Sequence, residues 1–157
     1  MAEGLAESGG VDGARTRRMR VAVVERVIEH AQRAAPEECC GLLIGGGADI
    51  IEAIAARNIA DQRATRFLIE PQDHLDALRH ARCRNLEVVG FYHSHPRWAA
   101  APSETDLAEA NYPNHLFLIV GLGPADAGPR SPDIRLYEYS EGAFLQIGFV
   151  VSPCARA

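Results

Sequence analysis

A largely apolar run at positions 86–92 leads directly into a His-Ser-His-Pro segment, and this junction constrains the fold more than any other feature of the chain. The run has the length and composition of a β-strand. Because side chains alternate along a strand, His93 and His95 point to the same face if the strand continues through them. Two ligands of one metal ion need that arrangement. The sequence therefore predicts a strand that ends in a paired histidine site.

A carboxylate that could join the two histidines follows after a loop of small residues at 99–102. Ser103 directly follows this loop, and Asp106 comes three positions after Ser103. Two histidines and one carboxylate leave one position of a tetrahedral Zn²⁺ open for water, which is typical of a catalytic site. The same residues also fit a helix N-cap with acids in the first turn. The residues alone leave open whether Ser103 acts in catalysis or only caps a helix.

A hydrolytic zinc site also needs a general base, and two adjacent acids offer one. Glu37 and Glu38 stand directly before an apolar segment at 39–45. On an extended backbone only one of two neighbouring side chains can face the metal.

At these positions the chain resembles the JAMM (MPN-plus) zinc metalloproteases, whose motif is a Glu, then His-x-His-Pro, then Ser and Asp at fixed spacing. The resemblance covers about residues 20–150, and the Glu-x-Cys-Gly-Leu context looks like the bacterial stand-alone members. It implies one Zn²⁺ per chain, a general base and an oxyanion donor. The matching residues are Glu38 as base, His93, His95 and Asp106 as metal ligands, and Ser103 as the oxyanion donor.

The mechanism expected from these residue types is hydrolysis of a peptide or isopeptide bond. Zn²⁺ lowers the pKa of a bound water from about 15.7 to about 7. Glu38 would take the proton as the water attacks the carbonyl and then pass it to the leaving amine. The Ser103 hydroxyl would stabilise the oxyanion. No covalent intermediate is required.

The order of helical and strand patterns predicts an α/β fold with a partly antiparallel sheet. The resemblance narrows this to the JAMM/MPN fold, a central mixed, largely antiparallel sheet flanked by helices with a core similar to cytidine deaminases. Deaminase chemistry is not supported, because the Pro-Cys-x-x-Cys half of that signature is missing. We expect helices at 24–31, from Pro71 (with Leu75, Leu78 and Ala81 inward) and around Asp106, a hairpin at 41–44 and 50–56, and strands at 66–69, 86–92, 115–120, 134–139 and 144–151.

The 157 residues are the length of one domain. Residues 1–18 lack periodic apolar positions and are expected to be a disordered leader, so Met19 is a candidate true start. Residues 19–151 are expected to form the catalytic domain and residues 152–157 a tail. Acidic residues outnumber basic ones by 21 to 16, which argues against a nucleic-acid partner. No apolar run is long enough to cross a membrane.

The four cysteines show no framework spacing, which favours reduced thiols and a cytoplasmic location. They are Cys39, Cys40, Cys83 and Cys154. Cys40 shares strand parity with Glu38, so we considered a redox thiol beside the site, but an inert core cysteine is favoured. Trp98, in the loop between the ligands, is expected either to cover the substrate or simply to pack.

The resemblance also implies the substrate class, a ubiquitin-fold protein with a flexible C-terminal Gly-Gly tail. The bacterial stand-alone members resemble enzymes that process sulfur carriers, trimming residues after Gly-Gly or releasing cysteine. We take this as the leading hypothesis. One alternative is an isopeptidase that removes ubiquitin-like modifiers from lysine. Another is a non-catalytic MPN scaffold, less favoured because every ligand residue is kept. The oligomeric state is left open.

Overall fold

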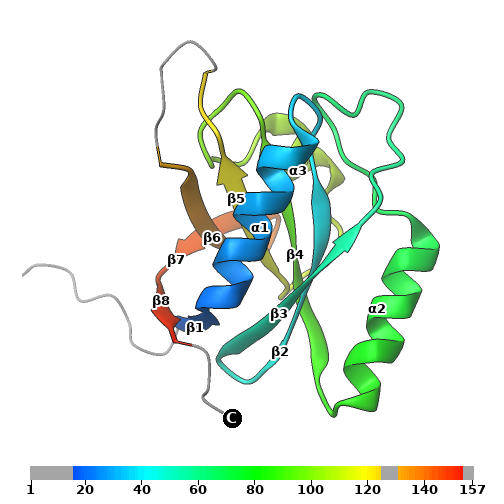
Figure 1. Cartoon of the computed structure of the whole chain (residues 1–157), viewed down its shortest axis with the longest axis vertical. Coiled ribbons are helices and arrows are strands. Elements are labelled where there is room, and N and C mark those ends of the chain that lie inside the picture. Colours follow the sequence, from blue (N-terminus) through cyan, green and yellow to red (C-terminus); the bar gives the residue numbers. More distant parts are fainter. Residues whose placement is uncertain (1–15, 125–130, 154–157) are drawn as a thin grey trace, which may run out of the picture.

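The computed structural model describes residues 16–124 and 131–153, which form a curled eight-stranded sheet with three helices (Figure 1). The strand order across the sheet is β7-β6-β5-β4-β2-β3-β1-β8. In chain order the elements are β1 (Arg17–Arg20), α1 (Val21–Ala34), β2 (Cys40–Gly46), β3 (Asp49–Ala56), α2 (Pro71–Cys83), β4 (Glu87–His95), α3 (Glu104–Glu109), β5 (Leu116–Gly121), β6 (Asp133–Ser140), β7 (Ala143–Ile147) and β8 (Phe149–Ser152). This confirms the predicted α/β class.

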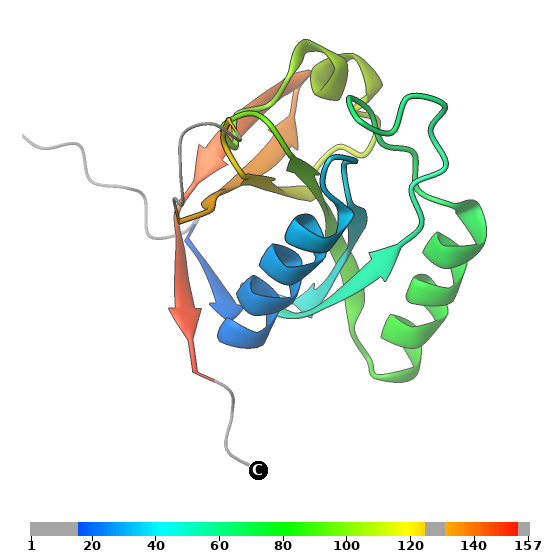
Figure 2. The same cartoon turned by 45° about the horizontal axis from the view of Figure 1, so that its top comes forward.

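The sheet is mixed, as predicted. Four of its strand pairings are antiparallel and three are parallel. β7 and β8 are joined by Gly148 alone, yet they lie at opposite edges of the strand order. The sheet must therefore curl far enough to bring its two edges together, and Figure 2 shows this curvature.

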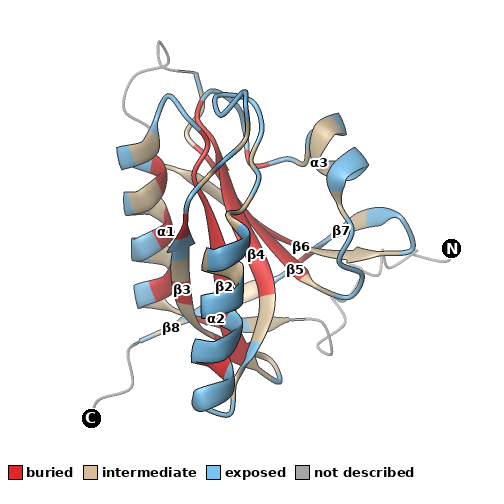
Figure 3. Cartoon of the chain, turned by 90° about the vertical axis from the view of Figure 1, so that its right-hand side faces the viewer, coloured by how far each residue is buried: buried red, intermediate tan, exposed pale blue. Residues whose placement is uncertain are grey.

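The two faces of the sheet carry separate apolar clusters. On one face, Val23 and Val27 of α1 pack with Tyr92 of β4. On the other face, Ala77 of α2 packs with Phe91 of β4. Figure 3 shows α1 and α3 on opposite sides of the buried central strands. Because side chains alternate along β4, the residues two and four positions after Phe91 lie on the α2 face.

Most of the predicted elements are confirmed, but two strands differ. The segment predicted as a strand at 66–69 forms only an isolated bridge between Asn58 and Ile69. The predicted strand at 144–151 is two strands, because β7 pairs with β6 whereas β8 pairs with β1. A residue pattern indicates which side chains are buried but not which strand the segment pairs with. The change of pairing partner at Gly148 therefore could not be predicted from it.

The inward face of α2 was also predicted wrongly in part. Leu75 and Leu78 are 41% and 43% exposed, whereas Ala77 and Ala81 are buried. Small alanine side chains let the helix approach the sheet closely, so the buried stripe is centred on them and the leucines lie beside it. The helix begins where predicted, with the Glu70 side chain accepting a hydrogen bond from the Gln72 amide.

β1 begins at Arg17, so the last two residues of the predicted disordered leader are part of a strand, and Met19 within that strand is fully buried. Residues 1–15 of that leader and residues 154–157 of the predicted tail, including Cys154, lie outside the described residues. Within 16–124 and 131–153, no helix is long and apolar enough to cross a membrane.

Candidate metal centre

The strand β4 continues through both histidines, as predicted, and holds them rigidly at its C-terminal end. His93 pairs in register with Cys40 on one side and Ile119 on the other. His93 and His95 are 1% and 3% exposed. A central strand paired on both sides has little freedom to twist, so the two imidazoles are presented together on the α2 face.

The nitrogen atoms of both histidines converge with one carboxylate oxygen. The His93 Nε2 and His95 Nε2 atoms are 3.2 Å apart, and the Asp106 Oδ2 atom lies 3.2 Å from the first and 3.1 Å from the second. Ligand atoms at about 2.0–2.1 Å from a tetrahedral Zn²⁺ are roughly 3.3–3.4 Å from one another. The observed triangle is therefore close in size to one face of a zinc tetrahedron.

Hydrogen bonding fixes the form of His95 that a metal requires. The His95 Nδ1 atom lies 2.9 Å from the Ala99 carbonyl oxygen, which only accepts, so Nδ1 carries the proton. In neutral imidazole the Nε2 lone pair then points toward Asp106 and His93, as it must to ligate a metal. The His93 ring stacks on Phe67, with centroids 4.4 Å apart.

Asp106 is positioned by the start of α3. The Ser103 Oγ atom accepts a hydrogen bond from the Asp106 amide at 3.0 Å, and Asp106 Oδ2 accepts one from the Ser103 amide at 2.9 Å. This is a capping box, so the predicted capping role of Ser103 is confirmed. Its role as an oxyanion donor stays a prediction. Without a metal, burial disfavours the charged carboxylate, but His93 and His95, when each carries a proton on Nε2, donate hydrogen bonds to it and lower the pKa of Asp106 below its usual range.

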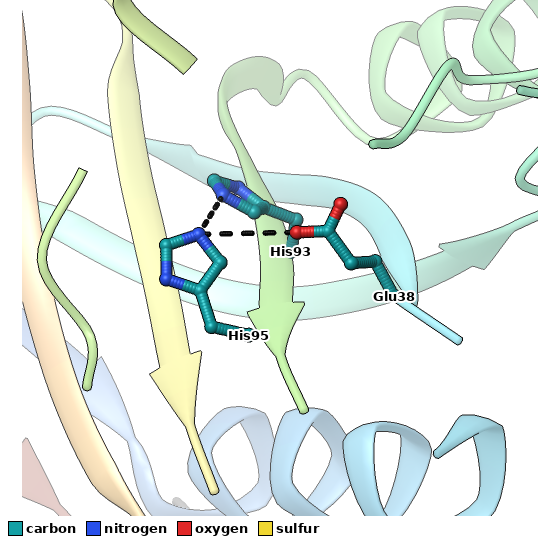
Figure 4. Close-up of side chains that lie close together, drawn as sticks. All are labelled: Glu38, His93 and His95. Carbon is teal, nitrogen blue, oxygen red and sulfur yellow. Dashed lines mark hydrogen bonds and ion pairs between the residues drawn. The ribbon is translucent and has the colours of Figure 1, made fainter. Parts of the chain in front are cut away.

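Glu38 faces the same site from the segment before β2 (Figure 4). Its side chain is 5% exposed, and its Oε1 atom lies 3.9 Å from His95 Nε2. Burial raises the pKa of Glu38 to about 7; the nearby His95 opposes this increase, and Asp106 adds to it. Glu37, by contrast, is half exposed and ion-paired with Arg63. The structure thus separates the two adjacent acids.

Two donor sets are therefore available to a cation. The ligand atoms of Glu38, His93 and His95 all lie within 4.8 Å of one another. Asp106 Oδ2 is closer to both imidazole nitrogens than Glu38 Oε1 is to His95. The residues present thus fit a metal ion, and Glu38 stands where a proton acceptor beside it would be needed.

Ser94 braces the site in a way that the sequence analysis missed. Its side chain is fully buried on the α1 face, where Oγ accepts a hydrogen bond from the Cys39 amide at 2.8 Å. The Ser94 amide in turn donates to the Cys39 carbonyl at 3.1 Å. Cys39 directly follows Glu38, so these bonds fix the distance between the acid and the histidine strand. The available signal was the hydroxyl between the two histidines, since a buried hydroxyl needs a partner.

Asn58 braces the same segment from the other side, and it was also missed. Its side-chain amide donates to the carbonyls of Glu38 and Arg66, both at 3.0 Å. Its side-chain oxygen accepts from the amides of Ala60 and Leu68. One side chain thereby ties the backbone of Glu38 to the segment 58–68.

The loop after His95 is held against β5 and β6. The Ala100 carbonyl accepts a hydrogen bond from the Tyr137 hydroxyl, and the Ala100 amide donates to Asp133. Gly121 lies so close to this loop that a Cβ atom added to it would be 2.5 Å from the Ala100 nitrogen. Trp98 is 64% exposed, so packing in the core is excluded. Its role in covering the substrate stays a prediction.

The described cysteines, Cys39, Cys40 and Cys83, are free thiols. Cys40 is fully buried, and burial raises the pKa of its thiol to about 12. Its Sγ atom lies 3.8 Å from the Ala56 carbonyl oxygen. The thiol is thus protonated and enclosed, which confirms the prediction of an inert core cysteine.

Residues 20–135 match the family described as prokaryotic homologs of the JAB domain. The protein belongs to this family. The resemblance to JAMM/MPN proteins of the prokaryotic type is thereby confirmed, and with it the JAB1/MPN fold.

The chain is also similar to two named relatives and two solved structures. The desampylase of Haloferax volcanii is 27% identical over 81% of this chain and 90% of its own length. The CysO-cysteine peptidase of Mycobacterium tuberculosis is 29% identical over 82% of this chain and 86% of its own. The solution structure of a Desulfitobacterium hafniense protein superposes with a TM-score of 0.77 at 25% identity, covering 88% of this chain and 94% of that one. A JAB1/MPN domain protein from Archaeoglobus fulgidus gives a TM-score of 0.54 at 22% identity, with 88% and 99% covered, and supports the fold alone.

Proposed function

We propose that this protein is a zinc-dependent peptidase that cleaves the bond after the Gly-Gly tail of a ubiquitin-fold sulfur-carrier protein. The observation that carries the proposal is the buried convergence of His93 Nε2, His95 Nε2 and Asp106 Oδ2 within 3.2 Å of one another, beside the buried carboxyl of Glu38. The name of the mycobacterial relative, a CysO-cysteine peptidase, supports the reaction class. In this proposal the predicted catalytic domain, residues 19–151, is a single domain that also includes Arg17 and Arg18 of β1 and Ser152 of β8.

His93, His95 and Asp106 would hold the metal. His95 is oriented for this role by its Nδ1–H bond to Ala99, and Asp106 by the Ser103 amide. The chemistry supplied by a bound Zn²⁺ is polarisation of the substrate carbonyl and acidification of a water molecule to a pKa of about 7.

Glu38 would move the proton. Two hydrogen bonds to the backbone hold its carboxyl at the site. The Ser94 hydroxyl accepts one from the Cys39 amide, and the Asn58 side chain donates one to the Glu38 carbonyl. A general base works best when its pKa lies near the working pH, and burial raises the pKa of Glu38 to about 7. Glu38 Oε1 accepts a proton from water as the water attacks the carbonyl, and it returns this proton to the leaving amine. The Ser103 hydroxyl would donate to the developing oxyanion.

A second candidate is the removal of a ubiquitin-like modifier from a lysine side chain. The name of the Haloferax relative, a desampylase, favours it. The same metal and base would serve both reactions, because only the leaving amine differs. A non-catalytic scaffold is not proposed, since a structural role requires neither a buried ligand triangle nor a base beside it.

Intact-mass spectrometry of a Gly-Gly sulfur carrier with extra C-terminal residues tests the proposal directly. Incubation with the protein and zinc is expected to give the mass that ends in Gly-Gly. Glu38→Gln and treatment with a chelator should each abolish the shift, whereas Glu37→Gln, which changes the exposed neighbour, should not. Cleavage that survives Glu38→Gln would remove Glu38 from its role. No cleavage of the extended carrier, with cleavage of a lysine-linked carrier, would favour the second candidate.

A further inference from the structure

A cavity of about 740 Å³ opens beside the proposed metal ligands. His93 and Asp106 form part of its wall. The remaining walls are the segment 60–69, His74 of α2, α3 with the residues just after it, and the α2-face side chains of β4, β5 and β7. The segment 60–69 and α3 lie side by side near the top of Figure 2. The volume is within the range of about 300–1,000 Å³ that is typical of ligand pockets.

Aromatic rings dominate the floor of this cavity. Phe91 packs against Tyr112 with centroids 4.9 Å apart and against Phe117 at 5.7 Å. Phe117 contacts Phe144 at 5.2 Å. Because each ring is held by another ring, the floor is a preformed apolar surface that does not need to collapse or rearrange before it binds a side chain.

The charges around the cavity do not suit an acidic ligand. Among the described lining residues, Arg66 is the only arginine, and its guanidinium is ion-paired with Glu109 across the gap between the segment 60–69 and α3. Asp61 and Asp106 bring the acids of the lining to three, and burial lowers the pKa of His74, which also lines the cavity. An anionic side chain would therefore meet more negative than positive charge, whereas an uncharged apolar one would meet the aromatic floor.

The position of the cavity indicates which part of a substrate would enter it. The two glycines before the cleaved bond have no side chains, so the first side chain on that flank comes at the third residue, roughly 7–10 Å away along an extended chain. On the other flank, the residue whose amine leaves carries its side chain right beside the cleaved bond. Since the cavity wall includes His93 and Asp106 themselves, the adjacent side chain is the one that fits.

We propose, on the basis of the function proposed above, that this cavity binds a large apolar side chain of the residue that follows Gly-Gly. Hydrolysis breaks the C–N bond of that amide, leaves a carboxylate on the second glycine and releases the residue with a free α-amine, one water being consumed. The enzyme is then a processing peptidase that prefers Phe or Leu after Gly-Gly over a small residue such as alanine or cysteine.

The first test compares carriers that differ only in the residue after Gly-Gly, namely Phe, Leu, Ala or Cys, each followed by the same two serines. Burying a Phe or Leu side chain is expected to raise kcat/KM about tenfold to a hundredfold over Ala. Ala108→Phe and Ala60→Leu each place a larger side chain on the cavity wall and should remove this preference, because kcat/KM falls more for the Phe and Leu carriers than for the Ala carrier. Leu107→Phe, on the same helix but outside the cavity lining, is the matched control and should keep it.

A binding measurement separates failure of this inference from failure of the proposed function. In the zinc-loaded Glu38→Gln protein, uncleaved Phe and Ala carriers are compared by isothermal titration calorimetry. Tighter binding of the Phe carrier, lost in Glu38→Gln/Ala108→Phe, supports the pocket even if no cleavage is found. Equal binding and equal cleavage of all four carriers would overturn the pocket and leave the peptidase intact. A preference for lysine-linked carriers over the Phe carrier would also overturn it.

Discussion

Replacing Ser94 with alanine isolates the contribution of the bond that ties Glu38 to the histidine strand. The Ser94 side chain is fully buried, and Cys39, whose amide donates to it at 2.8 Å, is 2% exposed. The substitution leaves that amide without its acceptor in a place that water does not readily reach. An unsatisfied buried donor costs about 1–3 kcal/mol. For a domain of this size, each kcal/mol lowers Tm by about 2–4 °C, so we expect a decrease of roughly 2–12 °C.

Activity should fall more than stability alone explains. The backbone at Cys39 is then held to β4 only by the Ser94 amide bond to the Cys39 carbonyl, so the neighbouring Glu38 carboxyl is placed less accurately. We expect kcat on a Gly-Gly carrier to fall about tenfold or more with zinc content unchanged, since a misplaced catalytic group can cost about 10²-fold. Calorimetry, metal analysis and the mass assay measure the three quantities. Ser140→Ala, at the end of β6, is the control. Wild-type Tm and wild-type kcat in Ser94→Ala would refute the bracing argument.

Three further predictions concern the ligands, the cap and the base. Asp106→Asn should lower zinc content measured by atomic absorption, because a charged ligand is replaced by a neutral one; full occupancy would exclude Asp106 as a ligand. Ser103→Ala should lower stability by about 0.5–2 kcal/mol through loss of the cap and lower kcat about 10²–10³-fold if the hydroxyl also serves the oxyanion; an unchanged kcat leaves only the cap. In the metal-free protein the raised pKa of Glu38, about 7, means that the folded state binds this proton more tightly than the unfolded chain. The contribution of Glu38 to the free energy of unfolding is therefore favourable below about pH 4.5 and is lost as pH rises through about 7. Urea unfolding should thus find metal-free Glu38→Gln more stable than wild type at pH 8, on the order of 3 kcal/mol, with the difference vanishing near pH 4; a constant difference would contradict the assigned pKa.

Local residue patterns predicted most of the elements that present the site. The apolar run at 86–92 and the one-residue spacing of the two histidines predicted a strand with both imidazoles on one face, and the structure extends β4 to His95. Ser103 and Asp106 specified a helix cap, and a capping box is present. These features depend on backbone geometry within a few residues, which side-chain type controls directly.

Other features depend on partners far along the chain. The division of residues 144–151 into β7 and β8 follows from pairing with β6 on one edge and β1 on the other. The exposure of Leu75 and Leu78 follows from how closely the alanine stripe of α2 approaches the sheet. The periodicity of a segment specifies neither how closely a helix approaches the sheet nor which strand another strand pairs with.

The sequence by itself determined which chemical groups are present and that the two histidines share a face, because strand alternation is a local property of the backbone. The residues alone left Glu37 and Glu38 open, and the family resemblance selected Glu38. The tertiary structure supplies the physical difference between them, since burial of Glu38 beside His95 and the exposed ion pair of Glu37 with Arg63 arise from segments that pack against them. It alone also closed the triangle with Asp106 and formed the aromatic cavity beside it. Both require β4, β5, α3 and the segment 60–69 to meet, and that meeting is decided by the long-range packing of the curled sheet.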